Sequence, residues 1–192
     1  GVGRMHPKAQ IDINRVQPGD KIIVSGQLAT HGMVIMSVRE GLEFETTIES
    51  DSCNLNYAVK ALLDTFGPDI HLLRDPTRGG VATVLTEIAR GKGLGVDLEQ
   101  RLLPIDPQVA GACEMLGLDP LYVANEGLFI AVVAEEQAEA ALSHLREQPH
   151  CEHAAIIGAV TADHPRKTVL TSSIGGKRVV NMLTGEQLPR IC

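Results

Sequence analysis

Residues 70–99 read IHLLRDPTRGGVATVLTEIARGKGLGVDLE, and this stretch decides the fold class. A short apolar run at 70–73 predicts a strand, and a second strand is expected at 96–99. Between them, residues 81–90 carry apolar side chains at helical spacing, which predicts a helix ended by Gly91. The strand–helix–strand order is typical of a layered domain in which helices pack against a sheet.

The same patterns continue on both sides of this stretch. Strands are expected at 21–26, 121–124, 128–133 and 155–160, and helices at 33–39, 54–66, 106–116 and 135–147. A β-hairpin is expected from 168–172 and 178–181 around Gly175-Gly176. We therefore predict a mixed α+β or α/β sandwich over residues 20–184. Residues 1–19 are expected to be a linker or edge segment, and residues 185–192 a flexible C-terminal tail.

Composition and charge exclude several classes of protein. The 192 residues are 44% hydrophobic and 21% charged with a net charge of −7, which is normal for a globular protein and unsuited to binding nucleic acid. No apolar run approaches the roughly 18 residues that a membrane span needs, and no leader opens the sequence. The four cysteines form no Cys-x-x-Cys pair, so no metal site is predicted. A cytoplasmic location is expected.

The loop Asp75-Pro76-Thr77-Arg78-Gly79-Gly80 is the first candidate site. Free backbone N–H groups at a helix N-terminus, two glycines and the nearby Arg78 could hold a phosphate. The alternative is a structural turn in which Asp75 and Thr77 cap the helix and the glycines permit the bend. The sequence leaves these two interpretations evenly balanced. Thr30-His31-Gly32 is a weaker version of the same pattern.

A second candidate is the turn Asn125-Glu126-Gly127, which lies between two apolar runs. A carboxylate in a hairpin turn is usually only solvated. The functional interpretation makes Glu126 a general base held at a strand end, with Gly127 allowing a substrate to approach closely.

The C-terminal segment ends in Cys192. A prenylation signal requires three residues after the cysteine, so that modification is excluded. A terminal thiol on an extended segment is well suited to carry a covalently bound group.

Three of these features resemble one family. The ending Pro189-Arg190-Ile191-Cys192, the loop 75–82 and the turn 125–127 are similar to the HypE family of hydrogenase maturation proteins. Residues 31–33 and 39–42 resemble it as well, and the similarity covers nearly the whole chain. The resemblance implies the fold of the C-terminal domain of aminoimidazole ribonucleotide synthetase.

The resemblance also implies a chemistry. Cys192 would accept a carbamoyl group from the carbamoyltransferase HypF, and ATP would then drive its dehydration to a thiocyanate. The cyano group would pass to iron on the HypC–HypD complex and become a ligand of nickel–iron hydrogenase. Glu126 would be the base that removes the nitrogen protons. The remaining site residues would hold the phosphoryl group or position the tail; they are Asp75, Thr77, Arg78, Gly79, Gly80 and Asn125.

Members of the family are longer than this chain. The resemblance implies that an upstream half carries most of the ATP and magnesium ligands and much of a homodimer interface. The chain is therefore expected to be the C-terminal part, unable to turn over ATP alone. Two alternatives stay open: a synthetase of the same fold acting on a diffusible substrate, and a docking module whose tail is only a recognition peptide.

Overall fold

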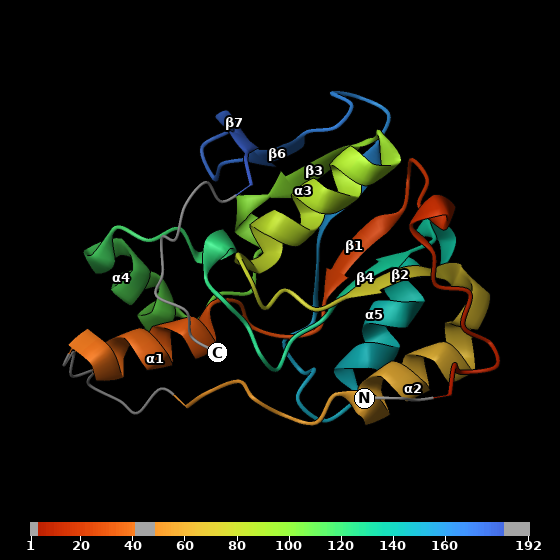
Figure 1. The fold of residues 1–192 in the computed structure, drawn as a ribbon, viewed down its shortest axis with the longest axis horizontal. Coiled ribbons are helices and arrows are strands. Elements are labelled where there is room, and N and C mark those ends of the chain that lie inside the picture. Colours follow the sequence, from red (N-terminus) through yellow and green to blue (C-terminus); the bar gives the residue numbers. More distant parts are fainter. Residues whose placement is uncertain (1–3, 41–48, 183–192) are drawn as a thin grey trace.

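The computed structural model describes residues 4–40 and 49–182. Within them, seven strands form one sheet in the order β2-β4-β1-β5-β3-β6-β7, and only the β3–β6 pair is parallel (Figure 1). The strands are β1 (Lys21–Val24), β2 (Ile70–Arg74), β3 (Gly95–Glu99), β4 (Ile130–Val133), β5 (Ala155–Thr161), β6 (Thr168–Thr171) and β7 (Lys177–Val180).

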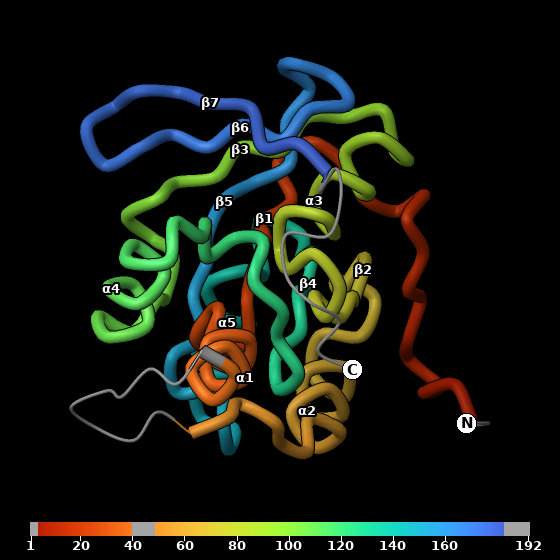
Figure 2. The backbone as a smooth tube through the Cα atoms, turned by 60° about the vertical axis from the view of Figure 1, so that its left-hand side comes forward, coloured from red at the N-terminus to blue at the C-terminus, as the bar shows by residue number. Residues whose placement is uncertain are grey.

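The helices cover both faces of this sheet. The α-helices are α1 (Thr30–Glu40), α2 (Asn56–Phe66), α3 (Gly80–Lys92), α4 (Pro107–Leu116) and α5 (Ala138–Arg146). Short 3-10 helices occur at Ile13–Arg15, Gly67–Asp69, Gln100–Leu102, Pro120–Tyr122 and Glu135–Gln137. In Figures 1 and 2, α1, α2 and α5 lie toward one end of the molecule and the β6–β7 hairpin toward the other.

Strand β1 shows how the sequence builds the two layers. Successive side chains of a strand point to opposite faces of the sheet. Ile22 and Val24 pack into the core formed with α3, whereas Ile23 packs into the core formed with α2 and α5. The central strand is therefore apolar on both faces, and the predicted layered α/β sandwich is confirmed.

A third, smaller core joins α1 to α4. Met33 of α1 and Val109 and Cys113 of α4 are fully buried together with Val123. This contact attaches α1 and α4 to the segment that precedes β4.

Most predicted elements are confirmed, and three differ. Residues 121–124 are not a strand: Pro120–Tyr122 is a 3-10 helix, since Pro120 opens the turn and the Asp119 side chain accepts a hydrogen bond from the Leu121 amide. Turn 125–127 therefore does not join two strands. Helix α3 continues through Gly91 and ends at Gly93, whose φ of +76° suits glycine. The predicted helix at 135–147 begins as a 3-10 turn and becomes α-helical at Ala138.

The segment before β1 packs onto the domain. Val16 is fully buried in the core of α3, and the Asp12 amide donates a hydrogen bond to the His71 carbonyl oxygen. The Asp20 carboxylate lies 2.7 Å from Nδ1 of buried His71 in β2. The predicted tail, including Cys192, lies outside the described residues.

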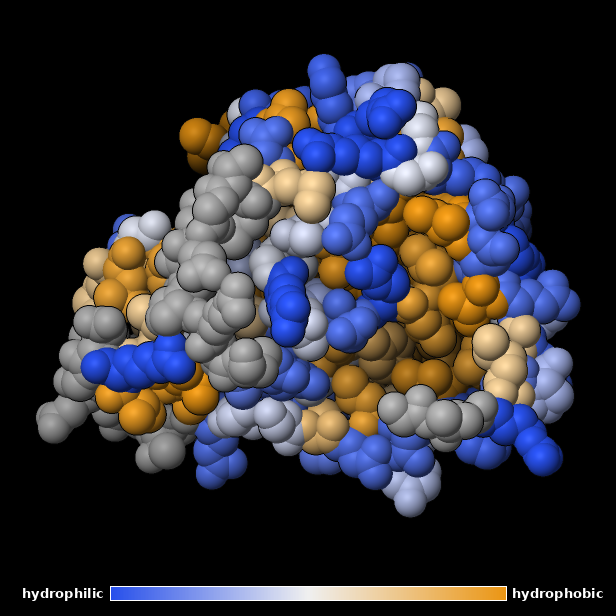
Figure 3. Space-filling model, in the orientation of Figure 1, coloured by the Kyte–Doolittle hydropathy of each residue, from blue (hydrophilic) through white to orange (hydrophobic). Residues whose placement is uncertain are grey.

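Figure 3 shows one face of the molecule, on which apolar side chains gather over β2 and β4 and toward α2. A large apolar surface patch is typical of a contact with another domain or subunit. No helix within residues 4–40 and 49–182 combines the length and hydropathy needed to cross a membrane.

Candidate active site

The fold brings the two candidate motifs together through Asn125. This side chain is fully buried, and its Nδ2 donates hydrogen bonds to the carbonyl oxygens of Pro76 (3.2 Å) and Val123 (3.0 Å). Its Oδ1 accepts a hydrogen bond of 2.8 Å from the Ala29 amide at the start of α1. The loop 75–80, the turn 125–127 and the N-terminus of α1 are thus held by one amide group. Since these backbone contacts occupy Asn125, they favour a positioning role for it.

Two glycines let helix termini approach the segment before this turn. At Gly80, where α3 begins, a Cβ would lie 2.4 Å from the Leu121 carbonyl oxygen, and φ is +61°. At Gly32, in the first turn of α1, a Cβ would lie 2.4 Å from a Val123 methyl carbon. Both contacts are shorter than any side chain allows, so these glycines are required by packing.

Gly127 has the same role on the other side of the turn. A Cβ at this residue would lie 1.6 Å from the Asp51 carbonyl oxygen. The position of a Cβ is therefore filled by the chain's own backbone, and packing requires glycine here. Gly127 seats the turn against residues 51–53.

Glu126 is half-buried at the point where these segments meet. Its backbone N–H donates to both oxygens of the Asp51 carboxylate, at 3.2 and 3.4 Å. The Glu126 backbone is therefore held on both sides. Asp51 binds its amide, and the neighbouring Asn125 is bound to Pro76. A carboxylate on a constrained turn is a suitable general base when a substrate proton is brought within reach.

Asp51 is itself half-buried beside a histidine. Nδ1 of His31 lies 3.6 Å from the Asp51 carboxylate and 2.9 Å from the Ser50 hydroxyl oxygen. Burial raises the pKa of the Asp51 carboxyl above its ordinary value, and the Glu126 charge acts in the same direction. Hydrogen bonds from the amides of Gly127 and Glu126, and the His31 charge, oppose this increase.

The loop 75–80 presents an uncapped helix N-terminus. Gly79 is the residue before α3, with φ of +70°, and as a glycine it has no side chain that could cap the helix. The Thr77 hydroxyl donates to the Asp75 carboxylate at 3.3 Å, and the residue before α3 is Gly79 rather than either of them. The two glycines have positive φ and permit the bend, as the structural alternative expects. Asp75 and Arg78 are exposed. The first residues of α3, Gly80, Val81 and Ala82, are buried, so Asp75 and Arg78 are the parts of this loop that face outward.

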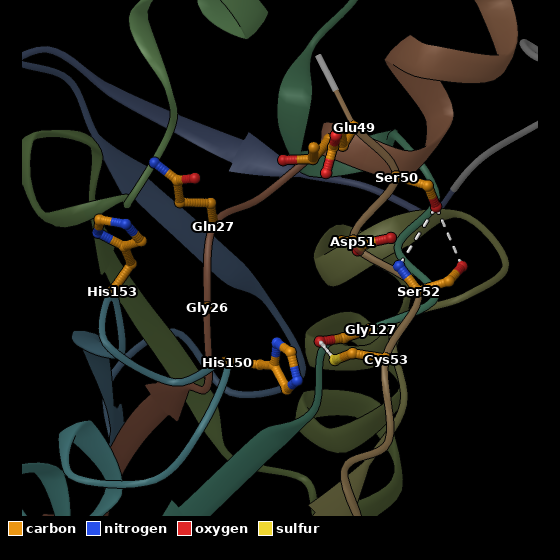
Figure 4. Close-up of a pocket in the computed structure, with 11 residues that line it drawn as sticks. Gly26, Gln27, Glu49, Ser50, Asp51, Ser52, Cys53, Gly127, His150 and His153 are labelled. Atoms are coloured by element: carbon orange, nitrogen blue, oxygen red, sulfur yellow. Dashed lines mark hydrogen bonds between the residues drawn. The ribbon is translucent and has the colours of Figure 1, made fainter. Parts of the chain in front are cut away.

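A cavity of about 390 Å³ lies beside the turn (Figure 4). It is lined by Gly26, Gln27, Thr30, Glu49, Ser50, Asp51, Ser52, Cys53, Gly127, His150 and His153. His150 faces Cys53 across it, and the Cys53 thiol lies 3.6 Å from the Gly127 carbonyl oxygen. Sequence reasoning did not select Asp51, Cys53, His150 or His153, because they come from separate loops with no ligand-like spacing. The polar run 49–53 was the one available signal.

The described residues contain no group of three His, Cys, Asp or Glu side chains that could hold a metal ion.

Taken together, the two-faced α/β sandwich and the convergence of a helix N-terminus with a carboxylate turn define a domain of the aminoimidazole ribonucleotide synthetase type. Residues 17–170 match the family described as AIR synthase related protein, C-terminal domain. The chain belongs to this family.

The chain is similar over its whole length to HypE proteins. It is 48% identical over 192 residues to the carbamoyl dehydratase HypE of Azotobacter vinelandii, which is 100% of this chain and 56% of the relative. The chain thus spans little more than half the length of the curated relatives it matches. The predicted resemblance to the C-terminal part of HypE is confirmed.

Two solved structures extend this comparison. A crystal structure of the hydrogenase maturation protein HypE in complex with ATP superimposes with a TM-score of 0.88 at 47% identity, covering 95% of this chain and 55% of that one. A crystal structure of a HypE–HypF complex superimposes with a TM-score of 0.85 at 39% identity, covering 90% and 56%.

Proposed function

We propose that this chain is the C-terminal part of an ATP-dependent carbamoyl dehydratase that makes the cyanide ligands of nickel–iron hydrogenase. The observation that carries the proposal is the bond between the two motifs: Asn125 holds the Glu126 turn against the loop 75–80. This arrangement brings the turn that carries Glu126 and the loop before α3 together, which supports a site formed by both. The identity of 48% to a carbamoyl dehydratase HypE supports the same function.

The proposed reaction starts at the Cys192 thiol. HypF transfers a carbamoyl group to the sulfur, so that an S–C bond replaces the S–H bond. The carboxamide oxygen then attacks the γ-phosphorus of ATP, an O–P bond forms and ADP leaves. Loss of both nitrogen protons and departure of phosphate, which breaks the C–O bond, convert the carboxamide to a thiocyanate.

Each site residue has a role that suits its position. Glu126 accepts a nitrogen proton, because a carboxylate on a constrained turn can be aimed at the substrate. The first turn of α3, with Gly79 and Gly80, stabilises the transferred phosphoryl group through backbone N–H groups. Arg78, Thr77 and Asp75 border this position and orient the phosphoryl group or the tail.

The proposal includes partners and a cosubstrate for the full-length protein. HypF donates the carbamoyl group, and the HypC–HypD complex receives the cyano group. ATP and magnesium bind mainly to the upstream half, and the protein acts as a homodimer in the cytoplasm. The HypE–HypF complex and the ATP complex of HypE relatives support the HypF and ATP assignments.

The deciding experiment is the mass of the Cys192 peptide after incubation with HypF, carbamoyl phosphate and ATP. A gain of about 43 Da would establish carbamoyl transfer to sulfur, and a later loss of about 18 Da would establish dehydration. Robust ATP hydrolysis by the 192-residue chain alone would contradict the assignment of the ATP ligands to the upstream half.

Three variants of the full-length protein separate the proposal from its alternatives. Glu126→Gln should accumulate the thiocarbamate, since the base is missing; normal conversion would exclude Glu126 as the base. Cys192→Ser should abolish cyanide synthesis, whereas a docking module would still support maturation. Deletion of residues 188–192 should abolish activity, whereas a synthetase with a diffusible substrate would keep it.

A further inference from the structure

We infer that Asp51 is a positioning residue that aims Glu126 at the substrate by binding the backbone of the 125–127 turn. This inference rests on the proposed function, in which Glu126 is the base. Asp51 does not contact the reacting atoms in this assignment, and it acts only through the turn.

The contacts of Asp51 converge on this turn. Its carboxylate accepts the Glu126 N–H, with the two oxygens at 3.2 and 3.4 Å from the nitrogen. Its own carbonyl oxygen fills the place where residue 127 would carry a Cβ. One residue therefore contacts the turn through both its side chain and its backbone. The direction in which the Glu126 side chain leaves the turn depends on these contacts.

Asp51 is held in turn by α1. The His31 imidazole lies 3.6 Å from the Asp51 carboxylate, and the side chains are 12% and 13% exposed. His31 is also linked to the neighbouring Ser50 hydroxyl at 2.9 Å. A side chain enclosed in this way has little freedom to change rotamer, which is the condition for positioning a second group.

Stability alone does not account for a carboxylate at this position. Burial makes the ionised form of Asp51 less favourable than it is in water, in spite of the two backbone amides. A neutral residue would avoid this cost. The Glu126 N–H nevertheless lies within hydrogen-bond distance of both carboxylate oxygens, and a carboxylate presents two acceptor oxygens where an amide presents one oxygen and a donor NH₂. A half-buried carboxylate at residue 51 therefore lowers the stability of the fold but holds the 125–127 turn in place.

The test uses the full-length protein with Cys192 already carbamoylated by HypF. Asp51→Ala should lower the single-turnover rate of dehydration about 100-fold, because the base is no longer aimed at the substrate, with KM for ATP unchanged. Asp51→Asn keeps one acceptor oxygen and should lose only about tenfold. Both variants should still accept the carbamoyl group, which shows that the tail and the fold are intact.

Asp106→Asn is the matched control. The Asp106 carboxylate accepts the Gln108 N–H at 2.8 Å before α4, where asparagine is an equally good cap. Its rate should stay within about twofold of the unchanged protein.

Two outcomes would overturn the inference. One is a dehydration rate for Asp51→Ala within twofold of the unchanged protein. The other is a raised KM for ATP with an unchanged rate constant, which would place Asp51 in ATP binding. Glu126→Gln separates this failure from failure of the proposed function. If Glu126→Gln blocks dehydration while Asp51→Ala does not, only the positioning role is lost; if Glu126→Gln converts normally, the proposed base itself is wrong.

Discussion

Asn125 and Pro76 are joined twice: the side-chain Nδ2 and the backbone N–H of Asn125 both donate hydrogen bonds to the Pro76 carbonyl oxygen, at 3.2 and 3.3 Å. The two residues are 49 positions apart in the chain. Their contact places the turn that carries Glu126 beside the loop that leads into α3. The candidate site therefore depends on a buried amide whose hydrogen bonds, within the described residues, go to backbone groups.

Asn125→Ala should destabilise the domain. The Ala29 amide and the Val123 carbonyl oxygen would lose their side-chain partner inside the protein, which costs about 3 kcal/mol in the free energy of unfolding. Equilibrium urea denaturation measures the change. Asn54→Ala is the control, because Asn54 is exposed and makes an exposed hydrogen bond, from the Asn56 amide at 3.3 Å, so its removal should cost about 1 kcal/mol or less. Equal effects of the two substitutions would contradict the anchoring role of Asn125.

Gly127→Ala should destabilise the domain and disturb the site. The added Cβ would lie 1.6 Å from the Asp51 carbonyl oxygen, so the backbone must shift at a cost of about 2–3 kcal/mol. Gly111→Ala is a matched control, because Gly111 lies inside α4 with nothing within 4 Å of its Cβ position. Alanine favours helix there and should add about 0.5–1 kcal/mol of stability. Urea denaturation should show a lower free energy of unfolding for Gly127→Ala and a higher one for Gly111→Ala than for the unchanged protein.

Asp51 should make stability depend on pH in an unusual direction. Since its pKa is raised above 3.8, the folded state holds the Asp51 proton to a higher pH than the unfolded state does. Stability is therefore lost as pH rises from 3.8 through the raised pKa. The Asp51→Asn variant has no ionisable group at residue 51, so its stability does not change with pH for this reason. The free energy of unfolding of the unchanged protein minus that of Asp51→Asn should decrease between about pH 3 and pH 7. An increase over this range would contradict the burial effect at Asp51.

Cys113 and Cys151 should resist alkylation in the folded protein. Burial raises the pKa of each thiol to about 11, so only about a thousandth of either is thiolate at pH 8. Iodoacetamide labelling followed by peptide mass analysis should show slow modification of both residues, and rapid modification after unfolding in urea. Fast labelling of either thiol in the native protein would contradict its burial.

The sequence predicted the elements better than the contacts between them. Helix α3 is apolar at 81, 84, 85 and 88 and lies where this spacing predicted. The strand predicted at 121–124 was wrong, because Pro120 and the Asp119 side chain favour a 3-10 turn over a strand. The loop 75–80 and the turn 125–127 were both selected as candidate sites, but nothing in a linear pattern shows that they meet.

The sequence by itself determined the layered α/β architecture, because hydrophobic periodicity is a local property that each segment carries alone. It also determined the family, because each of the motifs at 75–82 and 125–127 is an unbroken stretch of sequence that can be recognised without the structure. Only the tertiary structure decided that Asn125 binds Pro76, that the Asp51 carbonyl oxygen occupies the space beside Gly127, and that Asp51 holds the Glu126 amide. These contacts join segments far apart in sequence, and they arise from packing against the shared sheet, which no single segment encodes.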